Sequence, residues 1–180
     1  YDRIRNLLKY NNASGIIYVR TRKEAEELSM FLHRNQITNI DFFHAGIPAK
    51  EKNAKQNLWL KSPNQVLIST NAFGMGIDKD NVRFIVHFSP APSIENYYQE
   101  IGRAGRDGKP AETVLFYNLG DLIILRKFAE ESEQSEYNLE KLKLMQQYCE
   151  ANHCRRKILI NYFSESMFQD CSYCDVCENP

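Results

Sequence analysis

The sequence predicts an α/β fold, a parallel sheet covered by helices, followed by a small helical and cysteine-rich module. Short apolar runs alternate with helix-like segments up to Asn118, helical patterns alone follow, and four of the five cysteines lie from residue 154 onward. Strands separated by helices at this rhythm indicate βαβ units, which build parallel sheets with helices on both faces.

Apolar runs predict the strands. The first, Gly15–Val19, has no polar alternation, which is typical of a strand buried on both faces. Similar runs follow at intervals that leave room for one helix between neighbouring strands. The predicted strands are 15–19, 40–44, 65–70, 82–88 and 112–117.

Helix signals occupy the intervals between the strands. Thr21 is a candidate N-cap, and Glu24 three residues later completes a capping-box pattern. Leu28, Phe31 and Leu32 then give the segment an apolar face at helical spacing. The other predicted helices of this part are 48–60 and 93–104.

The pattern changes after Asn118. Residues 119–131, 137–152 and 154–163 read as helices, and the cysteine-rich end carries no helix or strand signal. We place the domain boundary within the segment 118–136 and divide the chain into domains 1–125 and 126–180.

The composition limits which functions the chain can have. With 43% hydrophobic residues the chain can bury a core, whereas 23 basic and 23 acidic residues cancel and give no global positive field. Nucleic-acid binding would therefore depend on local basic segments such as Arg20–Lys23 and Arg103–Lys109. No apolar run approaches 18 residues and no leader pattern opens the chain, so we expect no membrane association. Because the chain opens on Tyr1 without Met, we expect it to be a portion of a longer protein.

The segment from Gln99 to Arg106 is the most specific local signal. On a continuous helix, Gln99, Arg103 and Arg106 would lie within roughly 60° of one another. Paired arginines suit the charge that develops on a transferring phosphoryl group. Gly102 and Gly105 cost about 1 kcal/mol each inside a helix, so they call for a packing or close-approach reason. The alternative is an ordinary helix C-terminus, where arginines favour the helix dipole.

Cysteine spacing is the second strong signal. Cys171, Cys174 and Cys177 form two overlapping C-x-x-C units, and Cys154 precedes them. Four thiolates satisfy tetrahedral Zn²⁺ without an open position, which makes such a site structural. An iron–sulfur cluster is the chemical alternative. Cys149 falls outside the spacing and is interpreted as a small buried hydrophobe.

Several motifs together resemble a known family. Gln-x-x-Gly-Arg-x-Gly-Arg at 99–106 resembles motif VI of superfamily 2 helicases, and its flanks at 97–98 and 107–108 resemble the RecQ family in particular. Residues 15–22 resemble motif IV and residues 69–79 resemble motif V. The resemblance implies that the first part is a RecA-like domain, the second of a two-domain motor, and that the helical module binds zinc.

The resemblance also implies roles for particular residues. Arg106 would be an arginine finger on ATP. The other residues are assigned to the nucleotide, to DNA or to zinc. They are Arg103 and Gln99 beside Arg106, Asp78 and Gly76 at the nucleotide, Thr21, Arg22, Thr70 and Asn71 on the DNA backbone, and Cys154, Cys171, Cys174 and Cys177 on Zn²⁺. A capping role for Thr21 and a solvated Arg22 would look identical in sequence. Arg155 and Arg156 could clasp Asp175 or reach DNA.

The implied activity is 3′-to-5′ unwinding of DNA in recombination, repair or replication, driven by ATP and Mg²⁺. The chain has no G-x-x-x-x-G-K-[ST] phosphate loop, so an N-terminal RecA-like domain of the same polypeptide must supply it. The expected partners are that domain, ATP, and single-stranded and duplex DNA, in the bacterial cytoplasm or the eukaryotic nucleus. Two alternatives remain: a non-enzymatic zinc-containing DNA-binding module, and a superfamily 2 motor that acts on RNA or only translocates.

Overall fold

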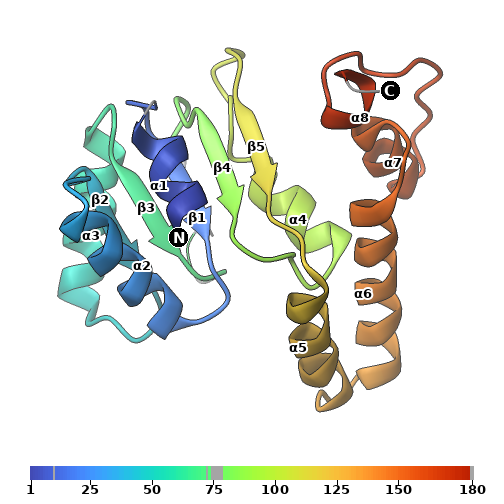
Figure 1. Cartoon of the computed structure of the whole chain (residues 1–180), viewed down its shortest axis with the longest axis horizontal. Coiled ribbons are helices and arrows are strands. Elements are labelled where there is room, and N and C mark those ends of the chain that lie inside the picture. Colours follow the sequence, from blue (N-terminus) through green and yellow to red (C-terminus); the bar gives the residue numbers. More distant parts are fainter. Residues whose placement is uncertain (10, 72, 74–78, 179–180) are drawn as a thin grey trace. The chain divides into compact units, whose positions relative to one another are not determined.

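The computed structural model describes residues 1–9, 11–71, 73 and 79–178 and resolves them into two compact units (Figure 1). The second unit takes in a short segment that precedes the last strand, so the two units interleave along the chain. The first unit contains Tyr1–Ser89 and Gln99–Phe116, and the second contains Pro90–Tyr98 and Tyr117–Pro180.

The first unit contains a five-stranded sheet in which all four strand pairings are parallel. Its strand order is β2-β3-β1-β4-β5, so β1 lies at the centre. The predicted parallel α/β architecture is confirmed, and every strand lies within its predicted range. The strands are β1 (Gly15–Tyr18), β2 (Ile40–Phe43), β3 (Val66–Ser69), β4 (Phe84–His87) and β5 (Glu112–Leu115).

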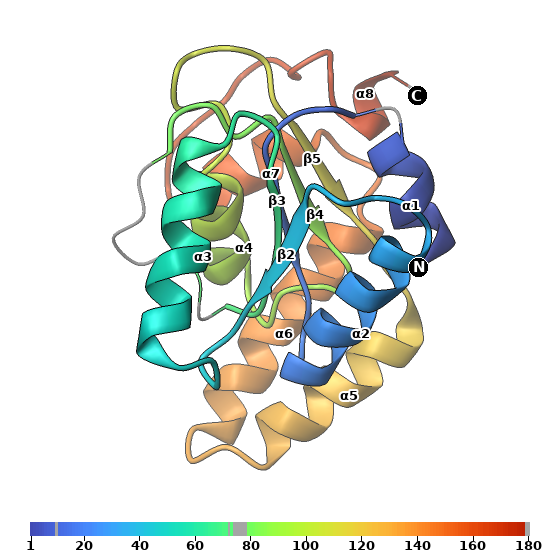
Figure 2. The same ribbon diagram turned by 90° about the vertical axis from the view of Figure 1, so that its left-hand side faces the viewer.

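Helices cover both faces of this sheet. Figure 2 shows α1 (Asp2–Lys9) and α2 (Arg22–Arg34) on one side and α3 (Ala49–Lys61) on the other. No helix was predicted at α1, which buries only Ile4 and Leu8. A helix this short is not stable by itself, so its packing on the sheet holds it.

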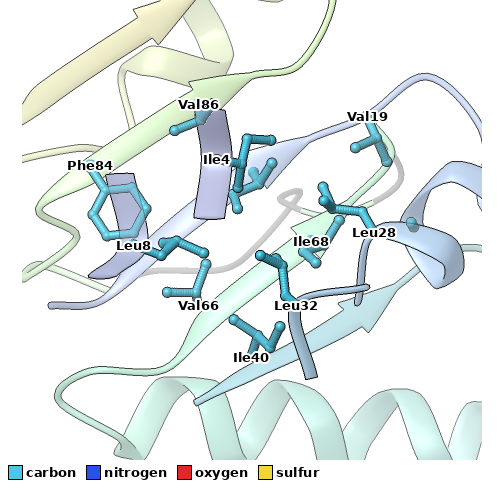
Figure 3. Close-up of a cluster of buried hydrophobic side chains, with 12 residues drawn as sticks. Ile4, Leu8, Val19, Leu28, Leu32, Ile40, Val66, Ile68, Phe84 and Val86 are labelled. Carbon is cyan, nitrogen blue, oxygen red and sulfur yellow. The ribbon is translucent and has the colours of Figure 1, made fainter. Parts of the chain in front are cut away.

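The side covered by α1 and α2 carries the larger apolar core. Ile4 and Leu8 of α1 and Leu28 and Leu32 of α2 converge on the strands (Figure 3). All four side chains are buried, which explains why apolar residues recur at helical spacing in these two helices. The strands, and Val19 directly after β1, complete this core with Ile17, Ile40, Val66, Ile68, Phe84 and Val86.

The opposite side packs around Trp59 of α3. Its ring lies edge-on to Phe73 with centroids 5.3 Å apart, and its Nε1 donates to the Gly15 carbonyl at 3.2 Å. Gly15 has no room for a side chain, because a Cβ there would lie 2.2 Å from the ring of Phe84. The start of β1 is thus fixed by one hydrogen bond and one close contact.

The helix α4 (Ile94–Ile101) ends earlier than predicted. The prediction that this helix extends to Ala104 was wrong. Gly105 adopts a left-handed φ of +65°, which is incompatible with a continuing helix. A second difference is α8 (Asp175–Glu178), a single turn in the cysteine-rich end, where no helix was predicted.

The second unit is built on an antiparallel helical hairpin. Helices α5 (Leu119–Glu130) and α6 (Ser135–Glu150) pack along each other, and α7 (Arg155–Tyr162) follows (Figure 1). Tyr97 and Tyr148 pack their rings 5.4 Å apart, which attaches the segment 90–98 to α6. Among the described residues, no helix combines the length and apolar character needed to cross a membrane.

We predict that Gly15→Ala lowers the free energy of unfolding by about 1–3 kcal/mol, because the added methyl overpacks a buried ring. Chemical denaturation measures this change. The matched variant is the pair Gly15→Ala with Phe84→Leu, in which the smaller side chain gives the methyl room. The pair should lose less stability than the two single variants summed, and strict additivity would contradict the close contact as the cause.

Candidate zinc centre and strand-end residues

The four cysteines predicted as metal ligands come together in the second unit. The Sγ atoms of Cys154, Cys171, Cys174 and Cys177 all lie within 4.8 Å of one another. Cys154 lies directly before α7, and Cys174 lies directly before α8. Four convergent thiols with no carboxylate or imidazole among them form the donor set of a closed tetrahedral zinc site. Cys149 lies outside the cluster and is half-buried.

Backbone N–H groups around the cluster favour thiolates. The amide of Cys171 donates to Cys154 Sγ at 3.3 Å, and the amide of Arg155 donates to Cys174 Sγ at 3.4 Å. Although burial acts to raise it, the amides of Arg155 and Cys177 bring the pKa of Cys174 down to about 7. The neighbouring thiol of Cys174 raises the pKa of Cys177 to about 12. A Zn²⁺ ion bound by the four sulfur atoms would favour the thiolate form of Cys177 as well.

Arg155 ties the cysteine cluster to the hairpin. Its Nε and Nη2 donate to the Asp175 carboxylate, both at 3.0 Å, and its Nη1 donates to the Tyr148 carbonyl at 2.6 Å. The guanidinium lowers the pKa of the Asp175 carboxyl through these hydrogen bonds. The sequence left open whether Arg155 pairs with Asp175 or reaches DNA. In the structure it pairs with Asp175. Arg156 instead lies over the ring of Tyr173, 5.4 Å from its centroid.

In the first unit, Thr21 and Arg22 lie just beyond the carboxyl end of β1. Thr21 is the N-cap of α2, and its side chain accepts a hydrogen bond from the Glu24 amide at 3.1 Å. The predicted capping box is thus confirmed. Because the Thr21 hydroxyl accepts this bond, its own proton remains available for a phosphate oxygen. The Arg22 guanidinium packs on Gly46, where an added Cβ would lie 3.0 Å from Nη1.

Thr70 and Asn71 follow β3, which neighbours β1. Tyr18 pairs with Ser69 in the parallel register, and the Val19 amide donates to the Ser69 carbonyl at 2.9 Å. The sheet therefore brings both predicted DNA-contact pairs, 21–22 and 70–71, to the same edge. Thr70 is buried and Asn71 is exposed. The carboxyl edge of an open parallel sheet is the usual place for ligands.

The arginine segment is arranged differently from the helix face that the sequence predicted. Only Gln99 is helical, because Arg103 and Arg106 follow the end of α4 in successive turns. Arg106 and Gln99 are exposed, whereas Arg103 is half-buried. Nε of Arg106 donates to the Gly102 carbonyl at 3.3 Å.

Backbone contacts hold this segment at the amino end of β4. The Gly105 amide donates to the Val82 carbonyl at 3.0 Å, and Arg83 pairs with the Asp107 carboxylate. The hydrogen bond from Arg83 lowers the pKa of Asp107. The Arg83–Asp107 pair was not predicted, because the two residues are 24 positions apart in the sequence. Residues 105–107 of the arginine segment thus lie at the amino end of β4, whereas Thr21 and Thr70 follow the carboxyl ends of β1 and β3.

The predicted nucleotide contacts Asp78 and Gly76 lie outside the described residues. The next residue, Lys79, is buried, and its Nζ donates to the carbonyls of Trp59 and, at 2.6 Å, Ser62. Burial lowers the pKa of Lys79 to about 8. Its amine thus satisfies carbonyls at the C-terminal end of α3, where a positive charge is favoured.

Comparison with known families agrees with both units. Residues 1–108 match the model of the helicase conserved C-terminal domain, and residues 119–178 match the model of the RecQ zinc-binding region. The first match covers more than half of the chain and defines the first unit as part of a nucleic-acid motor domain. With the zinc-binding region directly after it, the chain belongs to the RecQ family of helicases.

Individual relatives agree with this assignment. The ATP-dependent DNA helicase RecQ of Pasteurella multocida is 42% identical over 98% of the chain, which spans 28% of that protein. A putative ATP-dependent RNA helicase of Acanthamoeba polyphaga mimivirus is 38% identical over 94% of the chain, which spans 31% of it. Among solved structures, the second domain of the DEAD-box helicase Mss116p bound to an RNA duplex has a TM-score of 0.60 at 23% identity. That match covers 74% of this chain and 53% of that one, and it supports the fold.

We predict one tightly held zinc ion per chain. Cys174→Ala should lose the metal and give an insoluble or partly unfolded product, because structural metal binding is folding energy. Metal content by emission spectroscopy and thermal unfolding by circular dichroism measure the two effects. Cys149→Ala is the matched control and should keep its zinc. A soluble, metal-free Cys174→Ala chain that unfolds cooperatively would contradict the assignment.

A further prediction concerns the clasp between Arg155 and Asp175. Arg155→Lys keeps the charge but cannot reach the carboxylate and the Tyr148 carbonyl together, since lysine lacks the planar fork of donors. Groups that support metal ligands typically contribute roughly 10–100-fold in metal affinity. Competition with a chelator should show a zinc affinity reduced by that order. Arg156→Lys, with the same exchange one residue later, should leave the affinity unchanged, and equal behaviour of the two variants would argue against the clasp.

Proposed function

We propose that this chain is the second motor domain and zinc module of an ATP-dependent DNA helicase that unwinds duplexes in the 3′-to-5′ direction. The observation that carries the proposal is the arginine segment, held at the amino end of β4 with Arg106 exposed beside half-buried Arg103. The family membership of the chain and the printed activity of its bacterial relative support the same function. The chain spans less than a third of that relative, so the activity belongs to a longer polypeptide.

In this proposal the chain binds and orients ATP and DNA. ATP with Mg²⁺ would lie between this domain and an N-terminal RecA-like domain that carries the phosphate loop. Arg106 would contact the γ-phosphate, with Arg103 and Gln99 beside it and Asp78 and Gly76 at the ribose side. These contacts would favour a closed pair of domains only while the γ-phosphate is present, since a ligand shifts an equilibrium by its differential affinity.

The carboxyl edge of β1 and β3 would hold DNA. Thr21, Arg22, Thr70 and Asn71 gather at the carboxyl edge of β1 and β3 and offer hydroxyl, guanidinium and amide donors to phosphate oxygens. Closure at the arginine segment would then move this edge along a single strand. The zinc ion on Cys154, Cys171, Cys174 and Cys177 would act structurally, and the protein would work where DNA is, in the bacterial cytoplasm or the eukaryotic nucleus.

RNA is the second candidate substrate, because one relative carries the printed name of a putative RNA helicase. None of the proposed contacts at 21–22 and 70–71 reads a base or a 2′-hydroxyl, so phosphate contacts alone do not choose between the nucleic acids. Stimulation of ATP hydrolysis by single-stranded DNA and by RNA of the same sequence separates the two. Stronger stimulation by RNA would overturn the DNA assignment.

We predict that Arg106→Ala in the full-length protein lowers kcat of ATP hydrolysis by about 10³-fold or more, the range expected for an arginine finger. KM for ATP should change by no more than about threefold, because the lost contact acts mainly in the transition state. Lys109→Ala, which removes a neighbouring exposed cation, is the control and should keep its turnover. Near-normal kcat in Arg106→Ala would remove the finger assignment.

A further inference from the structure

The second unit contains a cavity of about 480 Å³ that neither the zinc centre nor the proposed nucleotide and DNA contacts use. It lies between the start of α4 and the end of the hairpin at which α5 and α6 are joined. Leu125, Phe128 and Ala129 line it from α5, Leu142 lines it from α6, and residues 92–96 contribute from the start of α4. A volume in this range can hold a small ligand or an anchoring side chain of a peptide.

Two aromatic side chains of the cavity wall are largely exposed. Phe128 is 55% exposed and Tyr137 is 56% exposed, although both line the cavity. Ile124, one helical turn before Phe128, is also exposed. Single exposed apolar residues are common, but a group of them beside a cavity is typical of an interaction site. Aromatic side chains are enriched at the centre of protein interfaces, where they supply large contact areas.

A network of three side chains holds the polar side of the cavity in place. Nζ of Lys141 donates to Oε1 of Glu95 and, at 2.8 Å, to the hydroxyl of Tyr162, which donates to the same Oε1 at 2.6 Å. Although burial acts to raise it, the hydrogen bonds from Lys141 and Tyr162 bring the pKa of Glu95 down to about 2. The Lys141 Nζ also lies 5.2 Å from the centroid of the Tyr137 ring. Glu95 and Lys141 therefore neutralise each other, and the wall that they form is ordered without a ligand.

The helix connection beside the cavity is acidic. Residues 128–140 contain five glutamates and no lysine or arginine. All five are exposed: Glu130, Glu131, Glu133, Glu136 and Glu140. Glu130 pairs with Arg126 at 3.0 Å, whereas the other four form no ion pair within the part of the chain that the structure describes. This surface repels the phosphate backbone of a nucleic acid and attracts a basic partner.

We propose that the cavity is a docking site for a basic peptide segment of a partner protein. One large apolar side chain of that segment would occupy the cavity against Phe128 and Tyr137, as anchor residues do in pockets at protein interfaces. Arginine or lysine side chains on either side of the anchor would face the glutamates of residues 130–140. Because a polyanion does not fit this charge, the docking site is separate from the proposed DNA contacts.

The test uses the full-length protein and a fluorescent peptide of about twelve residues in which one tryptophan is flanked by arginines. Fluorescence anisotropy should show binding with a Kd of about 1–100 μM. Replacing the tryptophan with alanine, or the arginines with glutamates, should weaken binding by about tenfold or more. No measurable binding at about 1 mM peptide would overturn the proposal, and this is also the result if another part of the polypeptide covers the cavity.

A matched pair of substitutions on α5 locates the bound peptide. Phe128→Ala removes part of the cavity wall and should weaken peptide binding by about tenfold or more. Ile123→Ala is the control, since Ile123 is 60% exposed on the same helix but is not among the residues that line the cavity. This control should keep its affinity for the peptide, and both variants should keep the unfolding temperature of the unsubstituted protein. Equal losses of affinity in the two variants would contradict the assignment of the cavity.

A second pair of variants tests the charge. Glu133→Gln combined with Glu136→Gln should weaken peptide binding by about threefold or more at low salt and by less at about 0.5 M salt, because salt screens exposed charges. Glu112→Gln combined with Glu165→Gln removes the same charge from other exposed positions and should keep the affinity. Equal weakening by both pairs would mean that the peptide is attracted to an acidic protein in general, and the docking site would be wrong.

The remaining measurement separates a protein partner from a nucleic acid. Phe128→Ala should retain zinc, DNA-stimulated ATP hydrolysis and affinity for single-stranded DNA, because the cavity is not part of the proposed motor contacts. A reduced affinity of this variant for single-stranded DNA would assign the cavity to nucleic acid and rule out the partner protein.

Discussion

The left-handed conformation of Gly105 is the constraint on which the arrangement of the arginine segment depends. At φ +65° the chain turns back so that the Gly105 amide reaches the Val82 carbonyl. A side chain here would meet the Lys109 carbonyl oxygen, since an added Cβ would lie 2.9 Å from it, and the backbone conformation would itself be strained. A helix that continued through residue 105 would carry Arg106 away from β4 and from the Arg83–Asp107 pair. The backbone conformation at position 105 therefore requires glycine whether or not a ligand is bound.

The sequence predicted the sheet well because β1, β3 and β4 are buried along their whole length. Runs such as Gly15–Val19 are continuous in apolar residues and too short for a typical helix, which favours a buried strand. The end of α4 was harder to predict, because Ala104 packs against the core and continues the apolar pattern past Ile101. The cost of Gly102 and Gly105 inside a helix was the available warning. It indicates a close approach of the backbone but does not say that the helix stops.

In the candidate site, too, local features could be predicted from the sequence and long-range contacts could not. Ligand spacing in the cysteine cluster is local, so the four cysteines could be identified from sequence alone. The clasp of Arg155 on Asp175 spans 20 residues, and the stacking of Tyr18 on His87 spans the β1–β4 pairing. Contacts of this kind follow from the strand order, which residue patterns do not specify. The arginines were thus predictable as a motif, whereas the Arg83–Asp107 pair that holds their segment was not.

Trp59 gives the molecule an internal optical reporter. It is the only tryptophan of the chain, it is 1% exposed, and its indole bonds to the Gly15 carbonyl at the start of the central strand. Its emission should therefore shift when the sheet opens and stay unchanged when the metal module alone comes apart. Release of zinc, followed with a chromogenic chelator, tracks the other unit. One sample can thus show whether the two units melt in a single event or one after the other.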